Sequence, residues 1–176
     1  MENLFFELKS KHNNKTYQCA ALWNGQCGFW CGYVGIDKDN GFYGLDYDDS
    51  YYMNLEVHGG VTFSGERADA THPSVVVQNE NMGLWFFGFD CGHHNDKTKL
   101  NPRGVERNLD FVKENCQKLL DELTSSAEIY LRFKNNRLIS TEEKNKLLAL
   151  ATIGDEYAVK YLNELKIKQQ QNTNLN

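Results

Sequence analysis

The sequence predicts an α+β fold: a twisted, mainly antiparallel sheet with one long helix packed on a face, plus small C-terminal helices. Two observations support this prediction. Over residues 1–100, short apolar and aromatic runs alternate with turn-forming residues, as in β-structure. From about residue 104, apolar residues recur at steps of three and four, which is the period of an amphipathic helix. With 176 residues, the chain is long enough to bury one core without disulfides or a metal.

Three strands are expected in the first 36 residues. Residues 4–8 and 16–23 are apolar-aromatic runs, and the turn-forming segment Lys11-His12-Asn13-Asn14 separates them. Residues 29–36 form the third run, which Gly32 and Gly35 interrupt. Glycines inside a strand often mark a bulge or a close backbone approach, so we expect one or the other there.

Further strands are expected beyond an Asp-, Gly- and Tyr-rich loop at 37–52. The dipeptide Gly59-Gly60 separates the runs 54–57 and 61–63, which indicates a hairpin or a bulge. Val75 to Val77 and Leu84 to Phe89 are the last candidates. The second of these is apolar on both faces, which predicts a central strand covered on both sides.

Helices are expected after residue 104. A helix over 104–124 carries one apolar stripe, expected to lie on the sheet: Val105, Leu109, Val112, Cys116, Leu119 and Leu123. Residues 127–133 fit either a strand or a helix. Ser140 and Glu143 have capping-box spacing and open a short helix, and Asp155 caps a last one that ends near residue 167.

A shift in composition divides the chain into two expected parts. Residues 1–134 are predicted to form the α+β core domain. Residues 135–176 are predicted to form a C-terminal helical extension with a frayed polar tail, because Asn135-Asn136 is typical of a connector and the last residues are almost all polar.

Charge and cysteine usage narrow the classes of function. The net charge is −5, and residues 1–100 hold 7 Lys and Arg against 13 Asp and Glu. Such an acidic region repels a phosphate backbone, so no general nucleic-acid binding is expected. Five irregularly spaced cysteines favour a reducing compartment. Without a signal peptide or an apolar run of about 18 residues, we expect a cytoplasmic protein with no membrane partner.

The densest polar segment runs from Asp90 to Asp96, where the strand at 84–89 enters a loop. Oxygen and imidazole ligands that suit zinc, manganese or iron are offered by Asp90, His93, His94 and Asp96, but their spacing matches no named zinc pattern. A turn whose carboxylate caps backbone amides is the first interpretation, and a metal, ligand-binding or acid–base site is the alternative. Cys91 lies two residues from His93, yet a cysteine that ends an aromatic strand is usually buried and inert.

His58 precedes two glycines, at a place where backbone can approach a ligand closely. If the segments at Val57 and Phe89 are neighbours, His58 is expected to meet Asp90. A carboxylate there would set the imidazole tautomer, which suits a general base, a metal ligand or a structural hydrogen bond.

Two further segments carry concentrated charge. Lys97, Lys99, Arg103 and Arg107 surround the start of the expected helix, where amides and cations together can hold an anion; a solvated basic face is the plainer interpretation. Residues 46–52 are acidic and tyrosine-rich, which suits either a contact with a partner protein or a cover for the sheet edge.

If these segments converge, they form one pocket for a base-plus-phosphate ligand. Trp85 would supply an apolar wall, Asp90 acceptors and the arginines donors. The candidate ligand-binding residues are His58, Gly59, Gly60, Trp85, Asp90, His93, Asp96, Arg103 and Arg107. The alternative is a zinc or manganese site held by His58, Asp90, His93 and Asp96.

Three motifs, followed by the helix from Val105, carry a family resemblance: residues 31–35 (Cys-Gly-Tyr-Val-Gly), 57–65 (Val-His-Gly-Gly-Val-Thr-Phe-Ser-Gly) and 85–93 (Trp-Phe-Phe-Gly-Phe-Asp-Cys-Gly-His). Over residues 15–123 the chain resembles a family of small uncharacterised proteins encoded by tailed phages and prophages. The resemblance implies a viral protein in the cytoplasm of a host cell. Accessory phage proteins of this size often act against host defence, by blocking a protein or sequestering a small signal, and by this analogy the chain is expected to do the same.

Three functions are compatible with these observations. The first is a phage or prophage accessory protein, a non-enzymatic counter-defence inhibitor that binds a host protein or a nucleotide-like small ligand without a cofactor. The second is a metal-dependent hydrolase that uses the His/Asp site. The third is a structural or assembly protein, which needs no polar site. Whether the chain is an enzyme stays open, with a binding role favoured, and so does homo-oligomerisation.

Overall fold

The computed structural model describes residues 3–48, 55–66 and 83–173. Its contacts divide the chain into two compact units, Met1–Leu123 and Thr124–Asn176. The predicted boundary after residue 134 concerns independent folding and stays a prediction. Two expected segments, Val75 to Val77 and most of the tyrosine-rich loop, lie outside the described residues.

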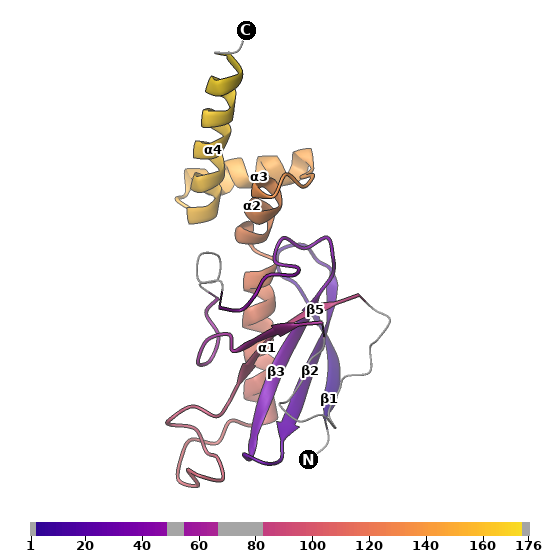
Figure 1. Cartoon of the computed structure of the whole chain (residues 1–176), viewed down its shortest axis with the longest axis vertical. Helices are drawn as coiled ribbons and strands as arrows, with labels where there is room; N and C mark the ends of the chain where they lie inside the picture. Colours follow the sequence, from indigo (N-terminus) through magenta and orange to yellow (C-terminus); the bar gives the residue numbers. More distant parts are fainter. Residues whose placement is uncertain (1–2, 49–54, 67–82, 174–176) are drawn as a thin grey trace. The chain divides into compact units, whose positions relative to one another are not determined.

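The first unit contains a five-stranded sheet in the order β1-β2-β3-β5-β4 (Figure 1). All four strand pairs are antiparallel, so the predicted α+β class with an antiparallel sheet is confirmed. The strands are β1 (Leu4–Lys9), β2 (Thr16–Asn24), β3 (Phe29–Ile36), β4 (Phe63–Gly65) and β5 (Trp85–Asp90). The expected run at 54–57 contributes no strand in its described part, 55–57.

The turn between β2 and β3 is stabilised by hydrogen bonds to the Asn24 side chain and by the left-handed conformation of Gly28. Oδ1 of Asn24 accepts hydrogen bonds from the amides of Gln26 and Cys27, at 3.2 and 3.0 Å. Gly28 has a φ of 81°, a left-handed conformation that glycine adopts without steric cost. Its amide donates to the Asn24 carbonyl at 2.7 Å. This turn fixes the register that places Trp23 opposite Trp30.

Helix α1 (Leu109–Leu123) packs on one face of the sheet, against β2 and β3 (Figure 1). Gly32 allows the close approach, because a Cβ there would lie 3.0 Å from Sγ of Cys116 and 2.5 Å from the Phe89 ring. Cys116 and Leu119 are fully buried, as the predicted stripe requires.

The start of α1 differs from the prediction. The helix begins at Leu109 rather than 104, with Oδ1 of Asn108 accepting from the Phe111 amide at 2.9 Å. Val105 was expected in the buried stripe, but it precedes the helix, forms a β-bridge with Asp96 and is 53% exposed. Tertiary hydrogen bonds to the loop at 95–97 therefore replace the first expected helical turn.

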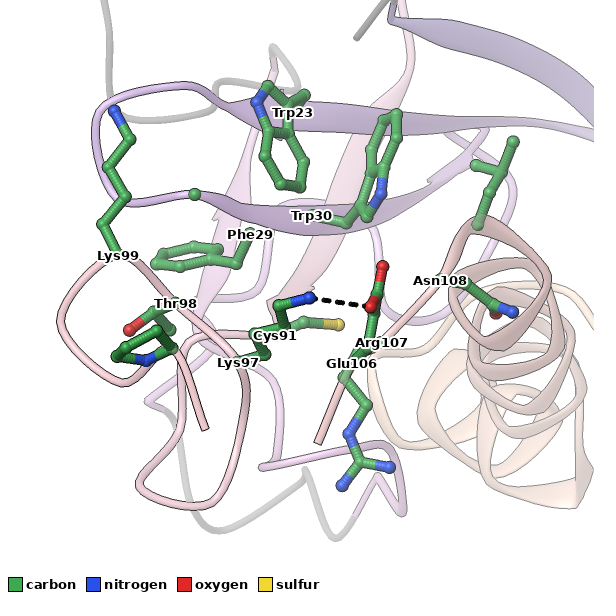
Figure 2. Close-up of a pocket in the computed structure, with 13 residues that line it drawn as sticks. Trp23, Phe29, Trp30, Cys91, Lys97, Thr98, Lys99, Glu106, Arg107 and Asn108 are labelled. Atoms are coloured by element: carbon green, nitrogen blue, oxygen red, sulfur yellow. Dashed lines mark hydrogen bonds and ion pairs between the residues drawn. The ribbon is translucent and has the colours of Figure 1, made fainter. Parts of the chain in front are cut away.

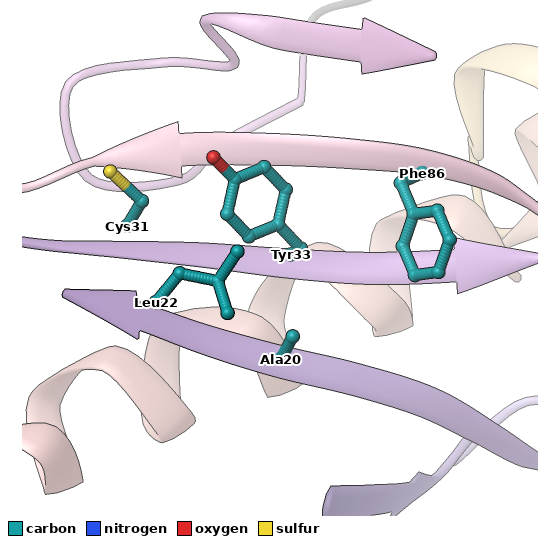
Figure 3. Packing of buried hydrophobic residues seen from close by; sticks show 5 residues of the cluster. All are labelled: Ala20, Leu22, Cys31, Tyr33 and Phe86. Carbon is teal, nitrogen blue, oxygen red and sulfur yellow. The ribbon is translucent and has the colours of Figure 1, made fainter. Parts of the chain in front are cut away.

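The opposite face of the sheet has its own apolar layer. Residues of a strand alternate between faces, so Cys31 and Tyr33 point away from the face on which Gly32 meets α1. Figure 3 shows this layer, which consists of Ala20, Leu22, Cys31, Tyr33 and Phe86. Phe86 is buried here, whereas Phe87 and Phe89 are buried on the side of α1. Strand β5 is therefore covered on both faces, as its sequence predicts.

The second unit contains three helices, α2 (Ser126–Lys134), α3 (Thr141–Thr152) and α4 (Glu156–Thr173). The capping box of Ser140 and Glu143 is present at the start of α3, and Oδ1 of Asp155 accepts from the Ala158 amide at 2.9 Å. Helix α4 has 18 residues and α1 has 15, so α1 is not the longest helix. The shared apolar core includes Ile129, Tyr130, Leu147, Ala158 and Tyr161.

Across the residues that the structure describes, no helix combines the length and the apolar character needed to cross a membrane.

Candidate functional site

A buried carboxylate, Asp96, organises the polar loop that comes after β5. Its side chain is fully buried. Oδ1 accepts a hydrogen bond from Nε of Arg107 at 2.7 Å, and Oδ2 lies 2.7 Å from Nε2 of His58. The backbone amide of His93 donates to Oδ2 at 3.1 Å. Because an ionised carboxylate only accepts, this arrangement places a proton on Nε2 of His58.

The backbone around Asp96 is equally well connected. Its amide donates to the His93 carbonyl at 2.8 Å, and its carbonyl accepts from Nδ2 of Asn101 at 3.1 Å. Gly104 packs directly on this backbone, since a Cβ there would lie 2.2 Å from the Asp96 carbonyl oxygen. Local hydrogen bonds therefore hold the loop in place. The carboxylate of Asp96 is bound by groups of the chain instead of by water.

Three donors dominate the charge state of Asp96. Burial by itself raises the pKa of Asp96, because it penalises the ionised form. Hydrogen bonds from Arg107, His58 and the His93 amide outweigh burial, so the pKa of Asp96 lies below its ordinary value. The carboxylate is therefore ionised at neutral pH and paired with Arg107, which makes it a poor proton acceptor.

The close approach predicted at Gly59 is present, but the group that approaches belongs to the chain itself. Gly59 has a φ of 69°, and a Cβ there would lie 1.6 Å from Nε2 of His93. The His58 ring meets the rings of His93 and Phe111 edge to face, with centroids 5.1 Å apart in both pairs. Side chains of the chain itself therefore pack against the His58–Gly59 segment.

The expected pairing of His58 with Asp90 is wrong. His58 bonds to Asp96, whereas Asp90 accepts from the Gly92 amide at 2.9 Å and from Oγ1 of Thr62 at 3.1 Å. Asp90 ends β5 in register with Cys31, on the sheet face opposite α1. Only the turn at 93–96 carries a carboxylate back towards Arg107, and the linear sequence does not reveal that turn.

The remaining candidates lie apart from this cluster. Trp85 begins β5 and Asp90 ends it, about 16 Å away at the usual rise per strand residue. The indole of Trp85 donates a hydrogen bond to the Leu45 carbonyl at 3.1 Å. Arg103 is exposed, and a Cβ on Gly60 would meet open space. The structure therefore brings together His58, Gly59, His93, Asp96 and Arg107, and leaves Trp85 and Arg103 outside.

Cys91 does not have the character of a nucleophile. The residue is 1% exposed. Burial, together with the charges of Asp96 and Asp90 and the nearby Cys31 thiol, raises the pKa of Cys91 to about 12. A protonated thiol is not the reactive form of cysteine at neutral pH.

The described residues offer few side chains that could hold zinc or manganese. Among the described residues, no three His, Cys, Asp or Glu side chains are grouped so that they could hold an ion. Both oxygens of Asp96 have donors already. Nε2 of His93 is buried without a hydrogen bond to the described chain, and it lies 3.9 Å from Oδ1 of Asp90. The metal site stays a prediction.

No family model, curated protein or solved structure matches this chain. The resemblance to phage and prophage proteins therefore stays a prediction that rests on the three motifs. Functional inference rests instead on the geometry of the chain itself.

A cavity of about 440 Å³ lies beside the loop that follows Asp96, and Lys97 to Lys99 line part of it. Figure 2 shows its apolar wall, which consists of Trp23, Phe29 and Trp30. The indoles of Trp23 and Trp30 meet edge to face, with centroids 5.2 Å apart. Gly92 makes room for the Phe29 ring, because a Cβ there would lie 2.5 Å from it. The hairpin of β2 and β3 thus presents three aromatic rings to one hollow.

Charged side chains complete the cavity. Nζ of Lys97 lies 2.9 Å from Oε2 of Glu106, and Figure 2 shows this ion pair beside the aromatic residues. Nζ of Lys99 donates to the Gly25 carbonyl at 2.6 Å. Arg107 also lines the cavity, although its Nε is held by Asp96. All three of these cations belong to the basic cluster that the sequence indicates as a candidate anion site.

Sequence reasoning missed Trp23 and Trp30 as site residues. One signal was present: two tryptophans flank a short Asn- and Gly-containing turn, and antiparallel pairing across such a turn places them side by side. The missing information was that the loop at 97–108 would fold over these rings and enclose a space.

Proposed function

We propose that this chain is a non-enzymatic binding protein for a nucleotide-like small ligand, and that the ligand binds in the cavity formed by Trp23, Phe29, Trp30, Lys97 and Glu106. The observation that carries the proposal is the combination of a ring-lined hollow with lysines at its edge. A volume of about 440 Å³ falls within the range of roughly 300–1,000 Å³ that is usual for small-molecule sites.

Stacking supplies the main part of the expected affinity. A base that stacks on an aromatic side chain gains about 1–3 kcal/mol, as judged by alanine substitution. Trp30 is 7% exposed, so its ring is held by the fold before a ligand arrives. A ring wall that is already ordered loses little side-chain entropy on binding, and this favours affinity.

Lysines at the edge of the cavity suit an anionic group on the same ligand. Side chains of Lys97 and Glu106 are 47% and 70% exposed, so water screens their ion pair and either partner can turn to a ligand at small cost. Lys99 lies on the same loop. Local positive charge therefore attracts a phosphate even though the whole chain carries −5.

A binding role is favoured over catalysis because the candidate reactive groups are occupied. Asp96 is ionised and paired with Arg107 and His58. Cys91 is a protonated, buried thiol. In the phage or prophage setting that the motif resemblance implies, such a protein would sequester a nucleotide-like host signal as a counter-defence inhibitor. Blocking of a host protein is the other form of this proposal.

Intrinsic fluorescence tests the proposal, because two of the three tryptophans line the cavity and Trp85 does not. In a Trp85→Phe background, mononucleotides are expected to quench the emission and to raise the melting temperature. Trp23→Ala is expected to weaken the binding by roughly fivefold or more, because about 1–3 kcal/mol of stacking is lost. Trp85→Phe alone is the matched control and should leave the affinity unchanged. If millimolar nucleotides change neither fluorescence nor melting temperature, the proposed function is refuted.

A further inference from the structure

The ion pair of Lys97 and Glu106 presents a hydrogen-bond donor and an acceptor side by side at the cavity. Nζ and Oε2 are 2.9 Å apart, and both residues line the space that the aromatic wall encloses. Glu106 makes no other hydrogen bond or ion pair within the described part of the chain, so its second oxygen, Oε1, can accept from a ligand. A flat ring stacked on Trp23, the half-buried member of the edge-to-face tryptophan pair, would meet this ion pair with its edge.

Glu106 and Lys97 bind different kinds of ligand atom. A carboxylate accepts through two oxygens in one plane, and it is best matched by two parallel N–H donors. A lysine ammonium only donates, and it is best matched by a carbonyl oxygen. The complementary ring edge therefore carries two N–H groups next to one carbonyl.

Guanine has this edge. We propose, resting on the proposed function, that the cavity selects a guanine-type ring, with its ring N–H and exocyclic amino group on the two oxygens of Glu106. Its carbonyl oxygen accepts from Nζ of Lys97, and Lys99 remains for the phosphate of the same ligand.

Other bases match the pair less well. Adenine offers one amino donor and one ring acceptor, so only one oxygen of Glu106 finds a partner. Hypoxanthine keeps the carbonyl and the ring N–H of guanine but lacks the amino group. Uracil and thymine place a second carbonyl where the carboxylate needs a donor, which sets two acceptors against each other. Guanine alone of these bases satisfies both side chains.

The size of the preference depends on the exposure of the pair. A good bidentate contact between a side chain and a base discriminates by roughly fivefold or more against the wrong base. Glu106 has a side chain that is 70% exposed, so water competes with the ligand and the lower end of this range applies. We therefore expect the 5′-monophosphate of guanosine to bind about fivefold more tightly than those of inosine and adenosine.

Fluorescence titration of the full chain with these three monophosphates tests the inference, because they differ only in the ring. Glu106→Gln removes the negative charge and one acceptor, and it should lower the affinity for the guanosine compound to that for the inosine compound. Glu114→Gln is the matched control: Glu114 is exposed on α1 and does not line the cavity, so the preference should persist. Melting temperature reports whether each variant folds. Lys97→Met provides a second variant, which should reduce the preference for guanosine over adenosine, because adenine lacks the carbonyl that Lys97 would bind.

The possible results distinguish guanine selectivity from nucleotide binding in general. A guanosine preference that Glu106→Gln abolishes and Glu114→Gln keeps supports the inference. Equal binding of all three monophosphates, unchanged by Glu106→Gln, overturns the guanine assignment and leaves the binding function intact. Failure of every nucleotide to bind overturns both.

Discussion

Replacing Asp96 by asparagine tests whether a buried ion pair holds the loop in place. Asparagine has nearly the same shape as aspartate, but it is neutral and has one side-chain acceptor where Asp96 uses two. Its amide nitrogen would face either Nε–H of Arg107 or Nε2–H of His58, so two donors would meet without an acceptor. The change therefore removes the charge and leaves at least one buried donor unpaired.

The structure sets the expected magnitude. Breaking a fully buried ion pair by removing one partner costs about 3–5 kcal/mol. Asp96 is fully buried, but the side chains of Arg107 and His58 are 24% and 17% exposed and recover some hydration. The lower end of the range of 3–5 kcal/mol therefore applies, and the free energy of unfolding should fall by about 3 kcal/mol. This loss corresponds to a fall in melting temperature of roughly 10 °C.

Urea unfolding followed by tryptophan fluorescence measures this change. All three tryptophans lie in the first unit, so the signal reports the unit that contains Asp96. A loss of about 3 kcal/mol should move the midpoint by roughly 1.5 M urea. Asp90→Asn is the matched control, because Asp90 is also a hydrogen-bonded carboxylate, with two donors, but its side chain is 30% exposed. It should cost about 1 kcal/mol. Equal shifts for both variants would refute the reasoning.

The same carboxylate predicts a dependence on pH. The folded pKa of Asp96 lies below its ordinary value of 3.8. The stabilisation from its ionised form is therefore fully present above that value and is lost as the pH falls through the folded pKa. Between neutral pH and pH 3, wild type should lose more stability than Asp96→Asn, and a constant difference across this range would contradict the assignment.

Two further predictions concern the domain boundary and the metal. A chain that ends after Leu123 should give a cooperative melting transition, whereas one that ends after Lys134 should aggregate, because Ile129 and Tyr130 lose their partners on α3 and α4; the reverse result would favour the boundary expected from the sequence. The hydrolase alternative predicts near-stoichiometric zinc or manganese in purified protein, which His93→Ala should release. Elemental analysis that finds no ion, even after supplementation, would remove this alternative.

Local features were readable from the sequence because they depend on near neighbours. The runs at 4–8, 16–23 and 29–36 became β1, β2 and β3 within a residue at each end. Ser140 and Glu143 form the predicted capping box, since both of its hydrogen bonds span three residues. Asp155 caps α4 for the same reason. The alternation of apolar and polar residues in strands, the turn residues and the helix caps each depend on residues a few positions apart. They can therefore be predicted from the sequence.

Several candidate residues were also recognisable by type. His58, His93, Asp96 and Arg107 were singled out as polar groups beside glycines or at strand ends, and the fold does gather them. Their partners were not recognisable. Two carboxylates were available to His58, and the turn at 93–96 selected Asp96 over Asp90.

Tertiary structure alone decided where α1 begins and where a ligand would bind. Val105 has the spacing of a helical residue, but a bridge to Asp96 and the packing of Gly104 on the loop outweigh one helical turn. Trp23 and Trp30 became a cavity wall only because the loop at 97–108 folds over the β2–β3 hairpin. The contacts between this loop and the hairpin join residues about 70 to 80 positions apart, and their free energy depends on three-dimensional packing that no local pattern encodes.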